Sequence, residues 1–391
     1  MTHKYLIGCA VALTAASLSS CIREEAANAE CDITGVDSAW VNQLYDSHII
    51  RSTNYFVSNN ALMFFKEKDA DCSSLAPIFT LTPGATINPA NGTVRDFSEP
   101  QTYTVTAEDG VWKKDYTVSF ILPLLNYKQD FARTELGGST SQYENFLFAQ
   151  DVTPAASVVP GTNTHTPDIA YLSHIWASGN GGYAFTGMAK SPEDYPTFSS
   201  AESDGNTYAR LETKATGSFG EAVNMRIAAG NLFIGEFREQ SAMLYPRRAT
   251  RFGLQILQGE PRTLQGKYKY TAGPDFTDET GEIRPEMHDT CDIYAVVYEV
   301  DPRDFVPLNG DDVLSSDRIV LMARIDDPGE PQEWTHFAEP FKAKNGKTFD
   351  PQRLEENGYA IAIVITSSRQ GAYFRGSVGS VLMVDDIEVT Y

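Results

Sequence analysis

Polar and apolar residues alternate on both sides of a short turn near residue 110. Strand-like runs cover residues 101–107 and 112–121, and Asp109-Gly110 lies between them. An Asp-Gly pair between two alternating runs is a strong signal for a β-hairpin. Short segments broken by Pro-Gly and Asn-Gly turns precede this hairpin. The pattern predicts a small β-sandwich of the immunoglobulin type over residues 31–122.

A larger set of strand-like segments fills residues 125–391. Several are continuous apolar runs, as expected of strands inside a sandwich. The candidates are residues 207–213, 251–257, 266–273, 291–300, 318–325, 334–341, 359–368 and 380–391. Polar loops separate them, and residues 350–358 are the best candidate for a helix. Two antiparallel sheets packed as a jelly roll are the simplest solution, so we predict an all-β chain with two domains.

The chain begins with a segment typical of export signals. A weakly basic start precedes an apolar run over residues 6–13, which is too short to span a bilayer but suits a signal peptide. Leu18 then precedes Cys21 with only small residues between them, which resembles bacterial lipoprotein signals. The resemblance implies cleavage of residues 1–20 and acylation of Cys21. The alternative is an ordinary cleaved signal with an incidental cysteine.

A short polar stretch after this cysteine is expected to be a tether over residues 21–30. Its Arg23-Glu24-Glu25 resembles the charged tag that directs lipoproteins of the Bacteroidetes to the outer face of the outer membrane. Acyl chains on Cys21 would hold the protein firmly to that membrane. We therefore expect a lipid-anchored, surface-exposed protein of the outer membrane.

Charge and cysteine content narrow the possible partners. The formal net charge is -21, so phosphates would repel the chain and we expect no nucleic-acid partner. No later segment is apolar enough to cross a membrane as a helix. Cys31 and Cys72 could pair in an oxidising compartment, whereas Cys291 is expected to be a small buried hydrophobe.

Six ordered blocks in the larger region resemble a known family. They cover residues 176–180, 209–213, 228–237, 252–273, 289–300 and 371–391. Together they are similar to the "putative carbohydrate metabolism domain" of Bacteroidetes lipoproteins, a jelly roll related to carbohydrate-binding modules. Residues 83–118 resemble the immunoglobulin-like domain that commonly precedes it. The resemblance implies a fold and a link to carbohydrate, but it brings no established catalytic residues.

Sugar-binding sites combine a flat aromatic ring with planar polar groups. Trp176, Asn180 and Tyr183 lie together in a glycine-rich stretch and are the first candidates. Their alternative is a core role, with Trp176 anchoring the loop. Tyr373 and Arg375, expected on one face of a strand, are the second pair. The guanidinium fork suits a carboxylate or vicinal hydroxyls, and the alternative is an internal salt bridge.

A further tryptophan lies at the start of a predicted strand. Trp334 should share a strand face with His336, opposite Thr335 and Phe337. We expect it to be a core or rim residue in preference to a platform for a ligand.

Hydrolysis of a glycoside would need two carboxylates about 5–9.5 Å apart. With 52 acidic residues, the sequence does not select a pair. The densest cluster places Glu286, Asp289 and Asp292 around His288, and a solvated loop explains it as well as catalysis does. There is no HExxH or GxSxG element, so a zinc or serine hydrolase has little support.

One acidic position bears on metal binding. Asp385 resembles the terminal-strand aspartate that often helps to hold a structural calcium in carbohydrate-binding jelly rolls. Calcium takes six to eight oxygen ligands, and the sequence does not identify the others. The spaced acids in residues 275–282 lack the spacing of an EF-hand and are expected to form a solvated loop.

These observations predict a glycan-binding surface lipoprotein that takes part in carbohydrate acquisition. The binding needs no cofactor, and the sequence does not decide whether the protein holds a structural calcium. The first alternative is a glycoside hydrolase with a carboxylate pair in a jelly-roll cleft. The second is an adhesion or surface-assembly component, which would show a flat apolar patch or an unpaired strand edge.

Overall fold

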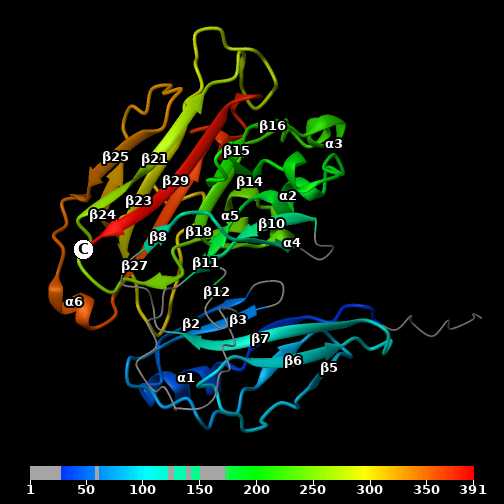
Figure 1. The fold of residues 1–391 in the computed structure, drawn as a ribbon. Helices are drawn as coiled ribbons and strands as arrows, with labels where there is room; N and C mark the ends of the chain where they lie inside the picture. Colours follow the sequence, from blue (N-terminus) through cyan, green and yellow to red (C-terminus); the bar gives the residue numbers. More distant parts are fainter. Residues whose placement is uncertain (1–27, 58–60, 122–126, 138–141, 150–171, 174) are drawn as a thin grey trace, which may run out of the picture.

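The computed structural model describes residues 28–391 apart from 58–60, 122–126, 138–141, 150–171 and 174. Strands dominate these residues and the helices are short, so the all-β class is confirmed. The predicted signal peptide, Cys21 and most of the tether lie outside the described residues. None of the described helices is long and apolar enough to cross a membrane. Figure 1 shows a small domain, blue to cyan, and a larger domain, green to red.

A five-stranded sheet forms the body of the small domain. Its strand order is β2-β3-β7-β6-β5; β3 and β7 are parallel, and the other pairs are antiparallel. A ladder of β1 and β4 and one helix complete the domain. The bounds are β1 Ile33–Val36, α1 Ser38–Asp46, β2 Ile50–Val57, β3 Ala61–Lys66, β4 Phe79–Leu81, β5 Thr86–Asn88, β6 Gln101–Thr106 and β7 Lys113–Ile121.

Helix α1 is an element that the pattern did not predict. The carboxylate of Asp37 caps it by accepting the backbone N–H of Trp40 at 2.8 Å. Trp40, Val41 and Leu44 are buried against the sheet. A helix of nine residues is marginal alone, so this packing stabilises it more than its own propensity does.

The predicted hairpin is confirmed as β6 and β7. Tyr103 and Val105 on β6 are buried, as are Tyr116 and Val118 on β7, so one face of the alternating pattern enters the core. Gly110 has φ +72° in the turn, a conformation that glycine adopts without steric cost.

Two antiparallel sheets form the larger domain, as predicted. One has the order β13-β18-β27-β23-β24-β26 with β19 and β20 alongside, and the other has β14-β15-β29-β21-β25 with β8 alongside. The first comprises β13 Trp176–Ala177, β18 Asn231–Phe237, β19 Thr250–Phe252, β20 Gln255–Ile256, β23 Asp292–Glu299, β24 Ile319–Arg324, β26 Lys342–Ala343 and β27 Tyr359–Thr366. The second comprises β8 Tyr127–Gln129, β14 Thr197–Ala201, β15 Thr207–Glu212, β21 Thr263–Thr271, β25 Thr335–Pro340 and β29 Val381–Thr390.

Shorter elements decorate the edges of these sheets. The small ladders pair β9 with β10, β11 with β12, β16 with β17 and β22 with β28. The bounds are β9 Thr134–Gly137, β10 Tyr143–Phe146, β11 Phe148–Ala149, β12 Leu172–Ser173, β16 Lys214–Ala215, β17 Ile227–Ala228, β22 Phe276–Thr277 and β28 Gly376–Ser377. The helices are α2 Asn180–Ala184, α3 Gly217–Ala222, α4 Glu239–Ala242, α5 Pro246–Ala249, α6 Pro351–Glu355 and the 3-10 turns η2 Pro192–Asp194 and η3 Gly371–Tyr373. The helix expected within residues 350–358 is confirmed as α6.

The main core lies between the two large sheets. β23 and β27 are buried on both faces because a second apolar cluster covers the far side of their sheet. This explains the continuous apolar runs in the sequence. Cys291 is fully buried there, as expected, and Cys31, Cys72 and Cys291 are free thiols.

The two domains share one buried core at their joint. Phe56, Met63 and Phe65 of the small domain belong to the same apolar cluster as Leu254 and Leu257 of the jelly roll. Hydrogen bonds flank this contact. The backbone N–H of Thr53 donates to the Pro302 carbonyl at 2.8 Å, and Asn54 Nδ2 donates to the Leu254 carbonyl at 2.7 Å.

Candidate functional site

The outer face of the six-stranded sheet carries a compact group of aromatic and charged side chains. Along β21, Leu264, Tyr268 and Tyr270 point into the core, so Lys267 and Lys269 between them point outward. The half-buried indole of Trp334, just before β25, contacts the Tyr208 ring of β15 edge-on, with ring centroids 5.5 Å apart. We call Trp334, Tyr208, Lys267, Lys269 and Glu202 the outer-face cluster.

Two lysines and one carboxylate fix the indole ring. Lys267 Nζ and Lys269 Nζ lie 5.4 Å and 5.0 Å from its centroid, within cation–π range. Glu202 accepts hydrogen bonds from Lys269 Nζ and from Trp334 Nε1, both at 3.0 Å. These two bonds lower the pKa of Glu202 below its ordinary value. The ring is therefore held in one orientation before any ligand arrives.

Lys267 is held by the acidic pair of β29. Its ammonium lies 3.0 Å from Asp385 and 2.9 Å from Asp386. Burial alone would lower the pKa of Lys267, but the hydrogen bonds that its ammonium donates to Asp386 and Asp385 outweigh burial and raise that pKa. Asn206 Nδ2 donates at 2.9 Å to Asp385 Oδ2, the same oxygen that pairs with Lys267. The cluster thus offers a ring bordered by fixed donors and acceptors.

These contacts do not fit the calcium site expected at Asp385. The carboxylate is almost fully buried, and a lysine ammonium already supplies the positive charge beside it. The described residues also contain no group of three or more His, Cys, Asp or Glu side chains placed to hold a metal ion. A cation at this position would have to displace Lys267.

The first predicted ring is in the core instead of at the surface. Trp176 on β13 is 4% exposed and packs against Phe131, with ring centroids 5.8 Å apart. Its neighbours have structural partners too. Asn180 exchanges hydrogen bonds with the backbone of Thr197 at 2.6 and 3.1 Å, and the Tyr183 hydroxyl donates to the Ala215 carbonyl at 3.1 Å. These side chains hold α2 in place, which is the alternative that the sequence left open.

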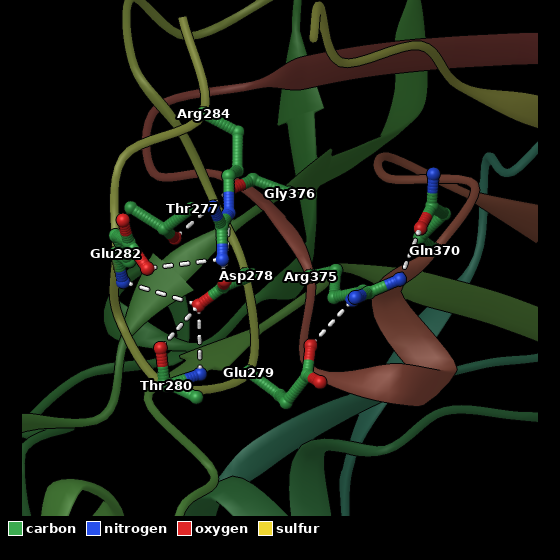
Figure 2. Close-up of polar contacts among 9 residues, drawn as sticks. All are labelled: Thr277, Asp278, Glu279, Thr280, Glu282, Arg284, Gln370, Arg375 and Gly376. Atoms are coloured by element: carbon green, nitrogen blue, oxygen red, sulfur yellow. Dashed lines mark hydrogen bonds and ion pairs between the residues drawn. The ribbon is translucent and has the colours of Figure 1, made fainter.

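The second predicted pair lies in a turn and not on a strand. Residues 371–373 form η3, and Phe374 has a left-handed φ of +58°, so the expected strand over 371–376 is wrong. Tyr373 is 53% exposed, and the Arg247 guanidinium lies 4.8 Å from its ring centroid. Figure 2 shows Arg375 paired with Glu279, with Nε to Oε2 at 2.5 Å, and reaching Gln370. The internal salt bridge is the observed state of Arg375.

The acidic loop beside Arg375 is solvated at Asp275, Glu279 and Glu282, as expected, and buried at Asp278. Asp278 is buried and accepts hydrogen bonds from the backbone N–H groups of Thr280 and Glu282, the Thr280 hydroxyl and both Nε and Nη2 of Arg284 (Figure 2). The bonds from Thr280 and Arg284 hold the pKa of Asp278 well below its usual range. This aspartate organises the loop as a fixed turn.

The acid and histidine cluster of residues 286–292 separates in the fold. Asp292 forms a bidentate pair with Arg324 at 2.7 and 2.8 Å, and the exposed His288 contacts Glu330. Asp289 accepts hydrogen bonds from Ser368, Ser380 and the backbone N–H of Ser377. Burial raises its pKa despite these bonds. The carboxylates of Asp289 and Asp292 are both almost fully buried, so the cluster forms no open acidic site.

The outer-face cluster lies away from the two hollows described in the structure. Two open hollows, of about 470 and 480 Å³, lie elsewhere. One is lined by residues 47–49 and 67–71, and the other by residues within 299–306 with Arg318 and Arg353. Neither includes a member of the cluster. The described geometry suits an extended ligand lying across a sheet better than one enclosed in a pocket.

Sequence reasoning missed Tyr208, Lys267, Lys269 and Glu202. Alternation along residues 263–271 did carry the signal that both lysines face outward. The sequence held no sign that they would meet Trp334, because register between distant strands decides that contact.

Comparisons with known proteins identify relatives of this chain. The family model described as "Putative carbohydrate metabolism domain" matches residues 161–390, and the model "SGBP, N-terminal", for surface glycan-binding proteins, matches residues 58–120. A structure from Bacteroides thetaiotaomicron, described as a putative glycoside hydrolase, has a TM-score of 0.78 and 42% identity, covering 94% of this chain and 99% of its own.

A second structure, from Bacteroides vulgatus, carries the same description. Its TM-score is 0.56 and its identity 36%, covering 68% of this chain and 97% of its own. A search of curated proteins found no match. The family expected from the sequence is confirmed for the larger region, and the SGBP-type match covers the segment where an immunoglobulin-like domain was expected. The chain belongs to the family of the putative carbohydrate metabolism domain, with an N-terminal region of the SGBP type before it.

Proposed function

We propose that this protein binds glycan across the outer face of its six-stranded sheet, as part of carbohydrate acquisition at the cell surface. One observation carries the proposal. A half-buried indole lies on the outer face of the sheet, held by Lys267, Lys269 and Glu202 in one orientation. Such a ring can stack on the apolar face of a pyranose while charged neighbours pair with its hydroxyls. The carbohydrate-related family supports the assignment.

Anchoring at the cell surface is the second part of the proposal. Cys21, which directly follows the leader of residues 1–20, would be the lipid attachment site, and the SGBP-type match supports a place on the surface of a Bacteroidetes cell. Many copies on one membrane would raise the avidity for a polymeric glycan above the affinity of one site.

Hydrolysis is the alternative function, and the descriptions of both solved relatives favour it. A glycosidase needs a general acid whose pKa is raised, and Glu202 has its pKa lowered. Among the described carboxyls, Glu144 is partly exposed and burial raises its pKa. If this protein cleaves glycans, Glu144 is the carboxyl to test first as the acid.

A glycan array with the soluble chain from residue 22 onward tests the proposal, with sugar release assayed on every hit. Trp334→Ala should weaken binding tenfold or more, because a stacked ring contributes about 1.4 kcal/mol or more. Trp112→Ala removes an exposed indole outside the cluster and is the matched control.

Three outcomes would count against the proposal. Equal binding by wild type and Trp334→Ala would remove the outer-face cluster as the site. Release of sugar that Glu144→Gln abolishes would establish the hydrolase. No binding on a broad array would favour an adhesion or assembly role.

A further inference from the structure

Two large apolar side chains stand exposed at the tip of the β6–β7 hairpin. In the two-domain chain, Val111 is 75% exposed and Trp112 is 61% exposed, so the jelly roll does not cover them. The hairpin extends to the right-hand end of the small domain in Figure 1. An exposed tryptophan beside an exposed valine is unfavourable in water, so an apolar partner at this tip would lower the free energy.

The backbone of this tip is closed by its own hydrogen bonds. Asp109 Oδ1 accepts the N–H groups of Val111 and Trp112 at 2.8 and 3.3 Å, and the Gly110 N–H donates to the Ala107 carbonyl at 3.0 Å. The Trp112 carbonyl also accepts the Ala107 N–H at 2.9 Å. Donors that are already paired can enter a less polar medium without losing bonds to water.

The point where the chain enters the small domain lies at the same tip. The Asn28 N–H donates to Glu108 Oε2 at 2.9 Å, and the Asp109 N–H donates to the Asn28 carbonyl at 3.3 Å. Asn28 Nδ2 also reaches the Pro83 carbonyl at 3.4 Å. The first described residue is therefore fixed directly beside Val111 and Trp112.

Chain length then limits how far this tip can be from a lipid anchor. Asn28 follows Cys21 by seven positions. An extended chain spans at most about 3.3–3.6 Å per residue, so Asn28 stays within about 25 Å of an acylated Cys21. The end of the domain that carries Val111 and Trp112 is thus the end held near the bilayer.

We propose that Val111 and Trp112 insert into the interfacial layer of the membrane and seat the small domain on the lipid. This rests on the proposed lipid anchor and extends it. Tryptophan favours this layer because its ring is apolar and its Nε1–H can bond to headgroups. The exposed Lys113 follows directly and can reach lipid phosphates. The anchored chain then has a second contact that sets the orientation of the domain.

Depth-dependent quenching of tryptophan fluorescence tests this in the full lipidated chain. The protein is reconstituted in phosphatidylethanolamine and phosphatidylglycerol vesicles that contain brominated lipids. Bromines near the headgroups should quench wild type more than Trp112→Phe, because Trp40 and Trp176 are buried and Trp334 lies on the jelly roll. Equal quenching of the two proteins would overturn the proposal.

Flotation of the unlipidated chain from residue 22 onward, with the same vesicles, tests the tip without the anchor. Val111→Ser with Trp112→Ser should reduce vesicle binding at least fivefold. Leu244→Ser, a 78% exposed apolar position on the jelly roll, should leave it unchanged. Equal flotation of all three proteins, or none by wild type, would refute insertion.

The two proposals fail separately. Trp334→Ala should impair glycan binding and leave quenching intact, whereas Trp112→Phe should do the reverse. If a soluble glycan protected Trp112 from acrylamide quenching, the tip would be a sugar site and the membrane assignment would be wrong. If Cys21 carries no lipid, flotation still decides whether the tip binds a bilayer.

Discussion

Replacing Phe65 with alanine should destabilise both domains, although Phe65 belongs to the small one. Its ring is 1% exposed at the joint and packs at 6.2 Å, nearly perpendicular, against Phe56. Both lie in the apolar cluster that includes Leu254 and Leu257 of the jelly roll. A Phe→Ala change at such a site costs about 3–5 kcal/mol of unfolding free energy.

The two domains can be followed separately through their tryptophans. Trp40 reports on the small domain and Trp176 on the jelly roll, and both are buried. In 5-fluorotryptophan protein, each gives its own ¹⁹F resonance during urea unfolding. With an m-value of about 3 kcal/mol per molar, Phe65→Ala should lower both midpoints by about 1–1.7 M.

A matched substitution within the small domain is the control. Phe97 is also 1% exposed, but it packs on Phe120 within the core of that domain. Phe97→Ala should shift the Trp40 midpoint more than the Trp176 midpoint. The reasoning is refuted if Phe65→Ala leaves the Trp176 midpoint at its wild-type value, because the joint would then contribute nothing to the jelly roll.

Two further predictions concern charged groups. Arg324→Leu leaves the buried Asp292 without its bidentate partner and should lower the unfolding free energy, measured in urea, by about 3–5 kcal/mol. Arg303→Leu breaks an exposed ion pair and should lower it by less than about 1 kcal/mol. Similar losses in the two variants would contradict this prediction. The lowered pKa of Glu202 means that its stabilising contacts persist above its ordinary pKa of 4.5 and are lost only as the pH falls through the lower folded value. Calorimetric glycan affinity should therefore stay constant from pH 8 to 5 and fall in stronger acid. Glu202→Gln should remove that acid step, and an equal step in the variant would show that another group titrates.

Local patterns predicted the strands well. The alternation around Asp109-Gly110 became β6 and β7, and each predicted strand segment of the jelly roll overlaps at least one observed strand. Helix α1 was missed because its three buried side chains lie in only nine residues, and tertiary packing stabilises it. The strand expected at Tyr373 failed because Phe374 adopts a left-handed conformation, which no pattern of polarity encodes.

The candidate site depends on contacts that sequence does not specify. Tyr208 and Trp334 are 126 positions apart, and their rings meet only because β15, β29, β21 and β25 are neighbours in one sheet. Trp176 looked like a ligand platform because glycines follow it. Its short strand pairs with β18 and places the ring against Phe131 in the core.

The shared core at the joint also fixes the orientation of the two domains relative to each other. To tilt one domain against the other, Phe56 and Phe65 must leave their apolar neighbours and contact water, at about 25 cal/mol per Å² exposed. Tilted conformations are therefore rarely populated. Copies attached to one surface would therefore present their glycan-binding sheet faces at a common angle. A long polymer bound by one copy could then bind a second copy without the entropy loss of ordering a hinge between the domains.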